Sequence, residues 1–373
     1  MAVHPVLTRG LVALALGASV LTGPPADART PDPASVSVTR FVERTVPAGA
    51  SGTLVAMRGH RVVACEGLGW ADRAARVPAG CDTVYDIGSL TKQFTAAAVV
   101  KLEMLGRLDV QDPIGRWLGP VPPDKEAITV QQLLTHTSGL VGSLGDDYER
   151  LSRRQLLRRA LASPLRTTPG SHYHYSNLGY SLLALIIERA SGTTYERFLA
   201  QHLFRPAGMR HTGYVLPHWR RADVAVEYDA RGRAQGRPFD HPWAASGPWW
   251  NLRGNGGLLS TANDLARWQR ALLDHRVLDR SAQRELFRPR VQEQPAGDSW
   301  YGYGWVLLDT PAGRVAWHNG GNGWSYAELA RVLGTGAMVF WVTNRVRSGG
   351  AWNLERDGVR LTGGVLRRLL AER

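Results

Sequence analysis

The placement of strand-forming and helix-forming segments along the chain is the feature that most constrains its fold. Segments rich in β-branched residues occur near the N-terminus, at 53–57 and 61–64, and Arg58-Gly59-His60 reads as the hairpin turn between them. Helical spacing dominates the middle of the chain, and strand-like segments return at 303–308, 314–317, 325–332 and 337–343. No repeat or low-complexity linker divides the 373 residues. This order predicts one sheet built from both ends, an inserted helical lobe, and a ligand cleft between the two lobes.

The expected helices divide between these two lobes. Apolar residues at helical spacing predict helices at 34–46, 89–105, 129–134, 151–161, 178–190, within 257–273 after an N-cap at Ser260 or Thr261, and at 356–370. The sheet lobe is therefore expected at about 34–106 and 255–373, and the helical lobe at about 107–254.

The first 28 residues are typical of a signal peptide. Arg9 precedes an apolar segment, 11–21, that is too short to span a bilayer, and Ala26-Asp27-Ala28 fits the pattern before a cleavage site. An uncleaved anchor is the alternative. We expect cleavage near Ala28, a mature chain of 29–373 without a transmembrane segment, and an exported protein, either periplasmic or secreted.

Two cysteines, Cys65 and Cys81, lie sixteen positions apart. Export favours a disulfide between them around the loop 66–80, and two buried free thiols are the alternative. The sequence contains no cluster of Cys and His at the spacing of metal ligands, so neither a metal nor another cofactor is expected.

The formal net charge of +13 comes almost entirely from arginine, because the chain has only three lysines, Lys92, Lys101 and Lys125. A basic surface could attract anionic envelope polymers or lipid headgroups, and a solvated compositional bias explains it equally well. We find no nucleic-acid-binding motif. Lysine, unlike arginine, can lose its proton in a protein, so a site that needs a proton-accepting amine must keep a lysine. Lys92 is a candidate for such a site.

The first chemical motif is Gly88-Ser89-Leu90-Thr91-Lys92 at the start of an expected helix. Residues i and i+3 share one face of a helix, so the Ser89 hydroxyl and the Lys92 amine can meet without any long-range contact. An adjacent base is what turns serine into a nucleophile. A serine that caps a helix with an unrelated lysine one turn later is the alternative, and taken alone it is the more common case.

The second motif is Tyr175-Ser176-Asn177. A tyrosine beside a cationic lysine can have its phenol pKa lowered, which would let Tyr175 relay the proton of the serine. Asn177 could orient a substrate amide or the lysine. Tyr173 lies nearby but has no asparagine two positions on.

The third motif, His318-Asn319-Gly320-Gly321, follows a strand-like segment. Glycines at a strand edge let a substrate backbone approach closely, and a backbone N–H there could complete an oxyanion hole with that of Ser89. The alternative is a simple glycine turn between two strands.

In this order the three motifs resemble the S-x-x-K, Y-x-N and K-T-G signature of class C β-lactamases and their relatives, which include D-Ala-D-Ala carboxypeptidases, D-aminopeptidases and esterases. The likeness covers roughly 36–344, and further matching stretches are 70–73, 87–89, 133–140, 175–180 and 256–261. The resemblance implies an α/β (α+β) fold of the β-lactamase/transpeptidase type, an antiparallel sheet flanked by helices with an inserted helical lobe.

The resemblance also implies a mechanism. Ser89 would be acylated, and Lys92 and Tyr175 would share proton transfer. Asn177 would contact the substrate, and the backbone N–H groups of Ser89 and Gly321 would bind the oxyanion. Water would then release the acyl group. The substrate would be a small molecule or a peptide, with the peptidoglycan stem among the candidates.

One departure from the signature matters, because the third motif has His318 and Asn319 where the family has lysine and threonine. Those residues hold a substrate carboxylate in penicillin-active members, and a histidine is only partly charged near neutrality. We therefore expect an esterase, a D-amino-acid peptidase or carboxypeptidase, or a weak β-lactamase. A non-catalytic penicillin-binding or peptidoglycan-sensing protein is the alternative. The G-x-S-x-G elbow of α/β-hydrolases is absent from the sequence.

Two further features stay open at this level. His136, inside one matching stretch, is expected to be structural. Trp243, Trp249 and Trp250 could form an apolar wall of the cleft or could belong to the core.

Overall fold

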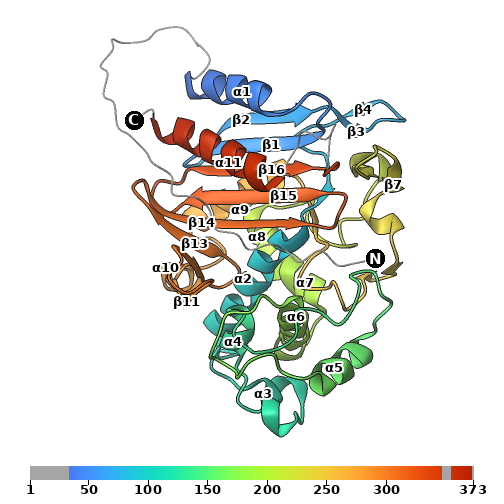
Figure 1. Ribbon diagram of the computed structural model, residues 1–373, viewed down its shortest axis with the longest axis vertical. Helices are drawn as coiled ribbons and strands as arrows, with labels where there is room; N and C mark the ends of the chain where they lie inside the picture. The colour runs from blue at the N-terminus through green and yellow to red at the C-terminus, as the bar shows by residue number, and fades with distance from the viewer. Residues whose placement is uncertain (1–32, 347–353, 372–373) are drawn as a thin grey trace.

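The computed structural model describes residues 33–346 and 354–371, so the expected signal peptide lies outside the described residues (Figure 1). An eight-stranded sheet, in the order β11-β12-β13-β14-β15-β16-β1-β2, forms the upper half of the molecule in this view. Its strands are β1 (Gly52–Arg58), β2 (Arg61–Leu68), β11 (Val291–Gln292), β12 (Ser299–Tyr301), β13 (Val306–Thr310), β14 (Gly313–Gly321), β15 (Tyr326–Val332) and β16 (Met338–Thr343). Every neighbouring pair is antiparallel, and β1 joins β16, so the predicted sheet built from both ends is confirmed.

Several strand boundaries differ from those expected, among them the end of β2, which continues to Leu68, and the boundaries of β13 and β14. The segment expected to begin at 303 turns first, because the N–H of Gly302 donates to the carbonyl of Trp305, and β13 starts at Val306. The segment expected to end at 317 continues to Gly321, because its last residues stay in register with β15, down to the pair Gly321 and Tyr326. The glycine motif therefore belongs to a strand and is not a simple turn.

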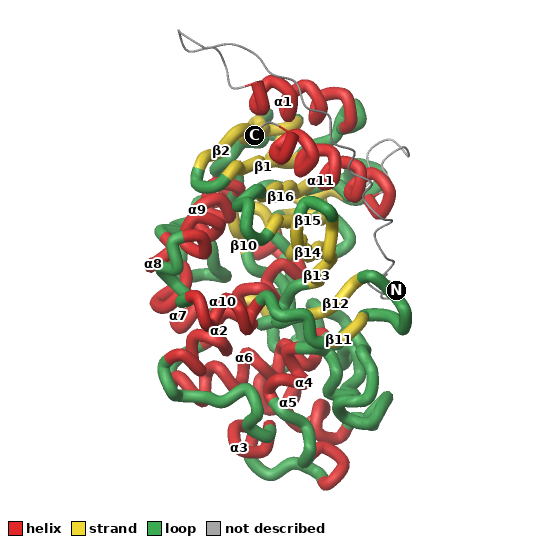
Figure 2. The backbone as a smooth tube through the Cα atoms, turned by 90° about the vertical axis from the view of Figure 1, so that its left-hand side faces the viewer, coloured by secondary structure: helices red, strands yellow, loops and turns green. Residues whose placement is uncertain are grey.

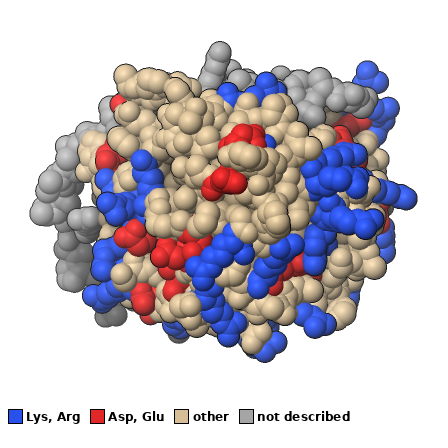
Figure 3. Space-filling model, turned by 90° about the horizontal axis from the view of Figure 1, so that it is seen from below, with Lys and Arg blue, Asp and Glu red and all other residues tan. Residues whose placement is uncertain are grey.

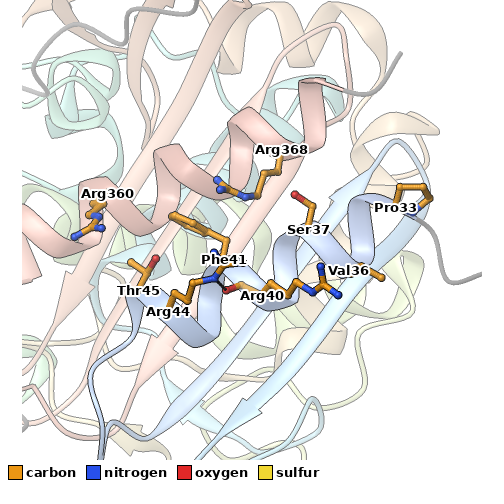
Figure 4. A pocket seen from close by; sticks show the side chains of 9 residues that line it. All are labelled: Pro33, Val36, Ser37, Arg40, Phe41, Arg44, Thr45, Arg360 and Arg368. Carbon is orange, nitrogen blue, oxygen red and sulfur yellow. Dashed lines mark hydrogen bonds between the residues drawn. The ribbon is translucent and has the colours of Figure 1, made fainter. Parts of the chain in front are cut away.

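The outer face of the sheet is covered by α1 (Pro33–Thr45) and α11 (Leu354–Ala371), as Figures 1 and 2 show. Alternation along β1 sends Leu54 and Ala56 into this outer core and Val55 and Met57 into the inner core. Arginines line the groove between the two helices, and the guanidinium of Arg368 lies 3.9 Å from the ring centre of Phe41 (Figure 4).

The inner face packs against α2 (Thr91–Met104) and α9 (Ala262–Leu273). Helix α2 is buried along most of its length, and it packs on α6 (Asn177–Ser191) at the junction with the helical half. The other helices there are α3 (Ile114–Leu118), α4 (Val130–Leu134), α5 (Arg153–Ala162), α7 (Tyr195–Leu199) and α8 (Arg205–Ala207), and α10 (Arg280–Leu286) lies beside the sheet (Figure 1). Side-chain caps fix several helix starts, and Thr261 caps α9.

Other expectations concern the disulfide, membrane-spanning helices, surface charge and metal sites. Cys65 and Cys81 are bonded as a disulfide, which ties β2 to the chain that leads into the nucleophile segment. None of the described helices combines the length and the apolar character needed to cross a bilayer. Seen from below, basic side chains form separate groups with acidic ones between them (Figure 3). Within the described ranges, no three His, Cys, Asp or Glu side chains come together as a metal site would require.

Candidate active site

Ser89 and Lys92 lie within hydrogen-bond distance of each other, as the spacing of the first motif predicts. Ser89 lies in a short 3₁₀ turn, Gly88–Leu90, that runs directly into α2. The Nζ atom of Lys92 lies 3.0 Å from the Oγ atom of Ser89 and donates a hydrogen bond of 2.7 Å to the carbonyl of Asn255. Ser89 keeps 9% of its surface exposed, whereas Lys92 is fully buried. The nucleophile therefore opens to solvent and its base does not.

Burial governs the protonation of Lys92. Removal from water lowers the pKa of its amine well below the usual range, and the charge of Asp147 offsets this shift only in part. An amine with a lowered pKa can accept the proton of the serine hydroxyl, which a permanently charged ammonium cannot.

The end of β14 packs directly on the nucleophile turn. A Cβ atom added to Gly320 would lie 2.1 Å from the backbone nitrogen of Ser89, and one added to Gly88 would lie 2.4 Å from that of Gly321. Gly88 also has a φ of +52°, which favours glycine. The two backbone segments thus touch without an intervening side chain, and the N–H groups of Ser89 and Gly321 are brought close together.

Tyr175 lies beside both members of the pair. The Lys92 Nζ atom is 4.8 Å from the centre of the Tyr175 ring, and the Tyr175 hydroxyl is buried next to that of Ser89 without a hydrogen bond of standard geometry. The expected lowering of its pKa is wrong. Burial raises the pKa of Tyr175 above the usual value, and the nearby Ser89 hydroxyl opposes this only in part. Tyr175 is therefore a neutral phenol that can donate a proton.

The rest of the second motif is fixed by the start of α6. Ser176 caps this helix by accepting the N–H of Gly179 at 3.0 Å, and Asn177 is the first helical residue. The side-chain carbonyl oxygen of Asn177 is buried and has no hydrogen-bond partner in the described part of the chain. The hydroxyl of Tyr173 turns elsewhere and donates to Glu293 at 3.1 Å.

His318 is buried beneath the site, which changes its expected charge. Its Nδ1 atom lies 2.6 Å from the carbonyl oxygen of Asn319 and its Nε2 atom lies 3.2 Å from the hydroxyl of Tyr301. Burial, followed by the charge of Lys92, lowers the pKa of His318 to about 3. The imidazole is thus neutral near pH 7, and the expected partial charge is wrong.

The side chain of Asn319 points away from the site. Alternation along β14 puts Ala316 in the inner core and Val315 in the outer core, so Asn319 faces outward with Val315. Its amide donates to the hydroxyl of Tyr326 at 3.1 Å. It is the backbone of Gly320 and Gly321 that packs against the nucleophile turn at Gly88 and Ser89.

Two residues at the site, Asn255 and Asp147, were not predicted from the sequence, whereas His136 was expected to be structural. The carbonyl of Asn255 accepts from Lys92, and its only sequence signal is its place before Gly256-Gly257. Asp147, a half-buried acid, interacts electrostatically with Lys92, and nothing in its loop sequence marks it. His136 accepts the N–H of Ser176 through Nδ1 at 3.0 Å, which holds the second motif in place and fits a structural role.

Of the three tryptophans, Trp250 belongs to the inner core and Trp243 packs against it. Trp250 is buried in the inner core, between the guanidinium groups of Arg153 and Arg253. Trp243 and Trp249 are only half-buried.

Comparison with known proteins identifies the family and the fold of the chain. The family model described as Beta-lactamase matches residues 38–363. The chain belongs to the β-lactamase family. A relative from Bacillus subtilis (strain 168) that carries a penicillin-binding-protein name, PbpX, is 30% identical over 259 residues. The match covers 69% of this chain and 62% of the relative, so the chain spans about three fifths of its length.

Solved structures of family members also superpose on the chain. The octameric penicillin-binding protein homologue from Pyrococcus abyssi is 25% identical with a TM-score of 0.73, over 88% of this chain and 76% of that one. A D-stereospecific amidohydrolase from Streptomyces sp. is 25% identical with a TM-score of 0.66, over 83% and 94%. These matches confirm the predicted β-lactamase/transpeptidase-like fold.

Proposed function

We propose that the chain is a serine hydrolase that cleaves an amide or ester bond through an acyl-enzyme on Ser89. The observation that carries this proposal is the buried Lys92 amine, 3.0 Å from the Ser89 hydroxyl and with a lowered pKa. A nucleophile and a base in hydrogen-bond contact are the minimum for covalent acyl transfer.

The proposed reaction begins when Lys92 accepts the proton of Ser89 and the serine oxygen bonds to the substrate carbonyl carbon. The negative charge on the carbonyl oxygen is stabilised by the N–H groups of Ser89 and Gly321. Tyr175 passes a proton to the leaving amine or alcohol, the bond to it breaks, and Lys92 returns the proton to Tyr175. Water then attacks the ester on Ser89 by the same route in reverse and releases the acid.

The preferred substrate carries no negative charge next to the scissile bond. This inference depends on the neutral His318, which cannot attract a carboxylate as a lysine would. Amides and esters of D-amino acids are therefore better candidates than β-lactams or peptidoglycan stem peptides that end in a free carboxylate. The similarity to a D-stereospecific amidohydrolase supports the amide class. We further propose that the protein works outside the cytoplasm, in the periplasm or the medium, because its disulfide would be reduced inside.

The test compares wild type with Ser89→Ala on p-nitrophenyl acetate, D-phenylalanine amide, a D-Ala-D-Ala peptide and nitrocefin. A fluorophosphonate should label Ser89, the ester and amide should turn over, and nitrocefin should turn over least. A folded Ser89→Ala variant that keeps wild-type hydrolysis would overturn the proposal. Labelling of Ser89 without turnover of any substrate would identify a non-catalytic binding protein instead.

A further inference from the structure

A pair of buried carboxylates lies behind the nucleophile turn. Asp86 belongs to β5 (Tyr85–Asp86) and Glu227 to β6 (Glu227–Tyr228), and both side chains are almost fully buried. One asparagine joins them. The Nδ2 atom of Asn322, in the turn directly after β14, donates to Asp86 Oδ2 at 3.0 Å and to Glu227 Oε1 at 2.7 Å. Both N–H bonds of that amide are therefore used.

Asp86 and Asn322, two members of this bridge, also accept hydrogen bonds from backbone segments next to the site. Asp86 Oδ1 accepts the N–H of Gly88, the residue before the nucleophile, at 2.7 Å. The Oδ1 atom of Asn322 accepts the backbone N–H groups of Trp324 and Ser325 at 3.0 and 2.9 Å. Asn322 therefore connects the turn that carries Ser89 to the end of the strand that carries Gly321.

The network ends in three ring side chains, those of His241, Trp324 and Tyr148. His241 lies with its Nε2 atom 2.7 Å from Glu227 Oε2, and its ring stacks on that of Trp324 with the ring centres 4.4 Å apart. Tyr148 packs against both rings. The charged and titratable groups around the bridge are thus Asp86, Glu227, His241 and Tyr148.

The carboxylate pair is costly, which argues for a role beyond packing. Burial, and then the charge of Glu227, raises the pKa of Asp86 to about 7, against the hydrogen bonds from Gly88 and Asn322 and the charge of His241. Two buried acids in contact repel each other, and apolar side chains of similar size would fill the space at lower cost. What apolar side chains could not supply is the hydrogen-bonded link between the two backbone segments that meet at Ser89.

We propose that Asn322 is a positioning residue that fixes the N–H groups of Ser89 and Gly321 relative to each other through Asp86. This inference rests on the proposed function, because it assigns those N–H groups to the oxyanion. A displacement of about 1 Å in such a site can slow a reaction about 100-fold. Asn322 does this without touching the substrate, so its loss should slow acylation and leave substrate binding nearly unchanged.

The decisive variant is Asn322→Asp, which keeps the shape and replaces two donors with a third carboxylate. At pH 8 we expect kcat for p-nitrophenyl acetate to fall about 10- to 100-fold while KM changes less than about 3-fold. Labelling of Ser89 by the fluorophosphonate should slow by the same factor. As the pH is lowered towards 5, the introduced carboxyl gains a proton and can donate again. The ratio of variant to wild-type rate should therefore rise.

A matched control separates this effect from a general loss of stability. Asn263 also donates from Nδ2 to a carboxylate, Asp82 at 2.7 Å, but on the exposed surface of α9. Asn263→Asp makes the same chemical change and should give wild-type rates at every pH. If Asn322→Asp does not fold, Asn322→Asp combined with Glu227→Gln restores the wild-type number of carboxylates, and the same rise of the rate ratio at low pH is expected.

Two results would overturn the inference. One is a folded Asn322→Asp variant whose rate ratio stays the same from pH 5 to pH 8. The other is a loss confined to KM. Failure of the wild type to be labelled at Ser89 would overturn the proposed function itself, whereas a labelled, active wild type with unaffected Asn322 variants would overturn only the positioning role.

Discussion

Two buried polar regions flank Ser89, and they have opposite chemistry. On one side lie nitrogen bases, Lys92, His136 and His318, whose pKa values burial lowers. On the other side lies the acid pair, where burial raises the pKa of Asp86. Since a low dielectric disfavours charge of either sign, both regions are driven towards their neutral forms.

The two regions differ in how completely their polar atoms are hydrogen-bonded. Each carboxylate oxygen of Asp86 and Glu227 has a partner. On the base side, within the described residues, the Nε2 atom of His136, the hydroxyl of Tyr175 and the side-chain oxygen of Asn177 have none. An unpaired buried polar atom costs about 1–3 kcal/mol. The contrast indicates that the acid side is a fixed support and that the base side is left open for substrate and protons.

The largest expected effect comes from removing the ability of the base side to change charge. Lys92→Arg replaces an amine that can accept a proton with a guanidinium that stays protonated, so kcat should fall about 10²- to 10⁴-fold in the p-nitrophenyl acetate assay. Lys101→Arg is the matched control, because Lys101 lies near the C-terminal end of α2 and donates to the carbonyl of Val277. It should leave kcat unchanged. A Lys92→Arg enzyme that keeps a tenth of the wild-type rate would show that Lys92 is not the base.

A smaller loss of kcat is expected when the hydroxyl of Tyr175 is removed. Tyr175→Phe removes the hydroxyl next to Ser89 and should lower kcat about 10- to 100-fold, less than Lys92→Arg, because the phenol relays a proton that Lys92 accepts first. Tyr173→Phe removes a hydroxyl that donates a hydrogen bond to Glu293, and it serves as the control. Equal rates for the two variants, measured with both ester and amide, would contradict the assignment of Tyr175.

Sequence reasoning reached the parts of the site that depend on local geometry. Ser89 and Lys92 meet because i and i+3 share a helix face, and Thr261 caps α9 because a hydroxyl can accept a backbone N–H there. Segments rich in β-branched residues likewise predicted most strands of the sheet, within a few residues at each end.

The parts that could not be predicted depend on contacts between distant segments. Asn322 is 236 positions from Asp86 and 95 from Glu227, so no local pattern marks the bridge. The extent of β14 is set by its pairing with β15, which continues the strand through the glycines and turns the Asn319 side chain outward. The charge states of Tyr175 and His318 depend on burial, which becomes known only once the fold is known.

The lowered pKa of Lys92 should also make the free energy of unfolding depend on pH. The pKa of Lys92 is lower in the folded protein than its usual 10.5, so the unfolded chain binds more protons between these two values. The free energy of unfolding should therefore rise with pH across that window, by up to about 1.4 kcal/mol per pH unit. Lys92→Met should flatten this rise in denaturant titrations between pH 7 and 10. Parallel curves for wild type and variant would mean that the buried amine is charged in the folded state.

Asp86, on the acid side, should make the free energy of unfolding fall as the pH rises, by a smaller amount than Lys92 makes it rise. Asp86 has a folded pKa of about 7 against a usual value of 3.8, so the folded protein binds more protons between these values and stability falls as the pH rises through this window. Glu227→Gln keeps an oxygen to accept from Asn322 but removes the charge that helps raise the pKa of Asp86. The variant should be more stable than wild type by about 1 kcal/mol at pH 7.5, with the advantage shrinking towards pH 4. Glu149→Gln, which alters a surface ion pair with Arg159, should leave the slope unchanged. If Glu227→Gln instead follows the wild-type slope, Glu227 does not raise the pKa of Asp86, and the two sides of Ser89 are less alike in their response to burial than the structure indicates.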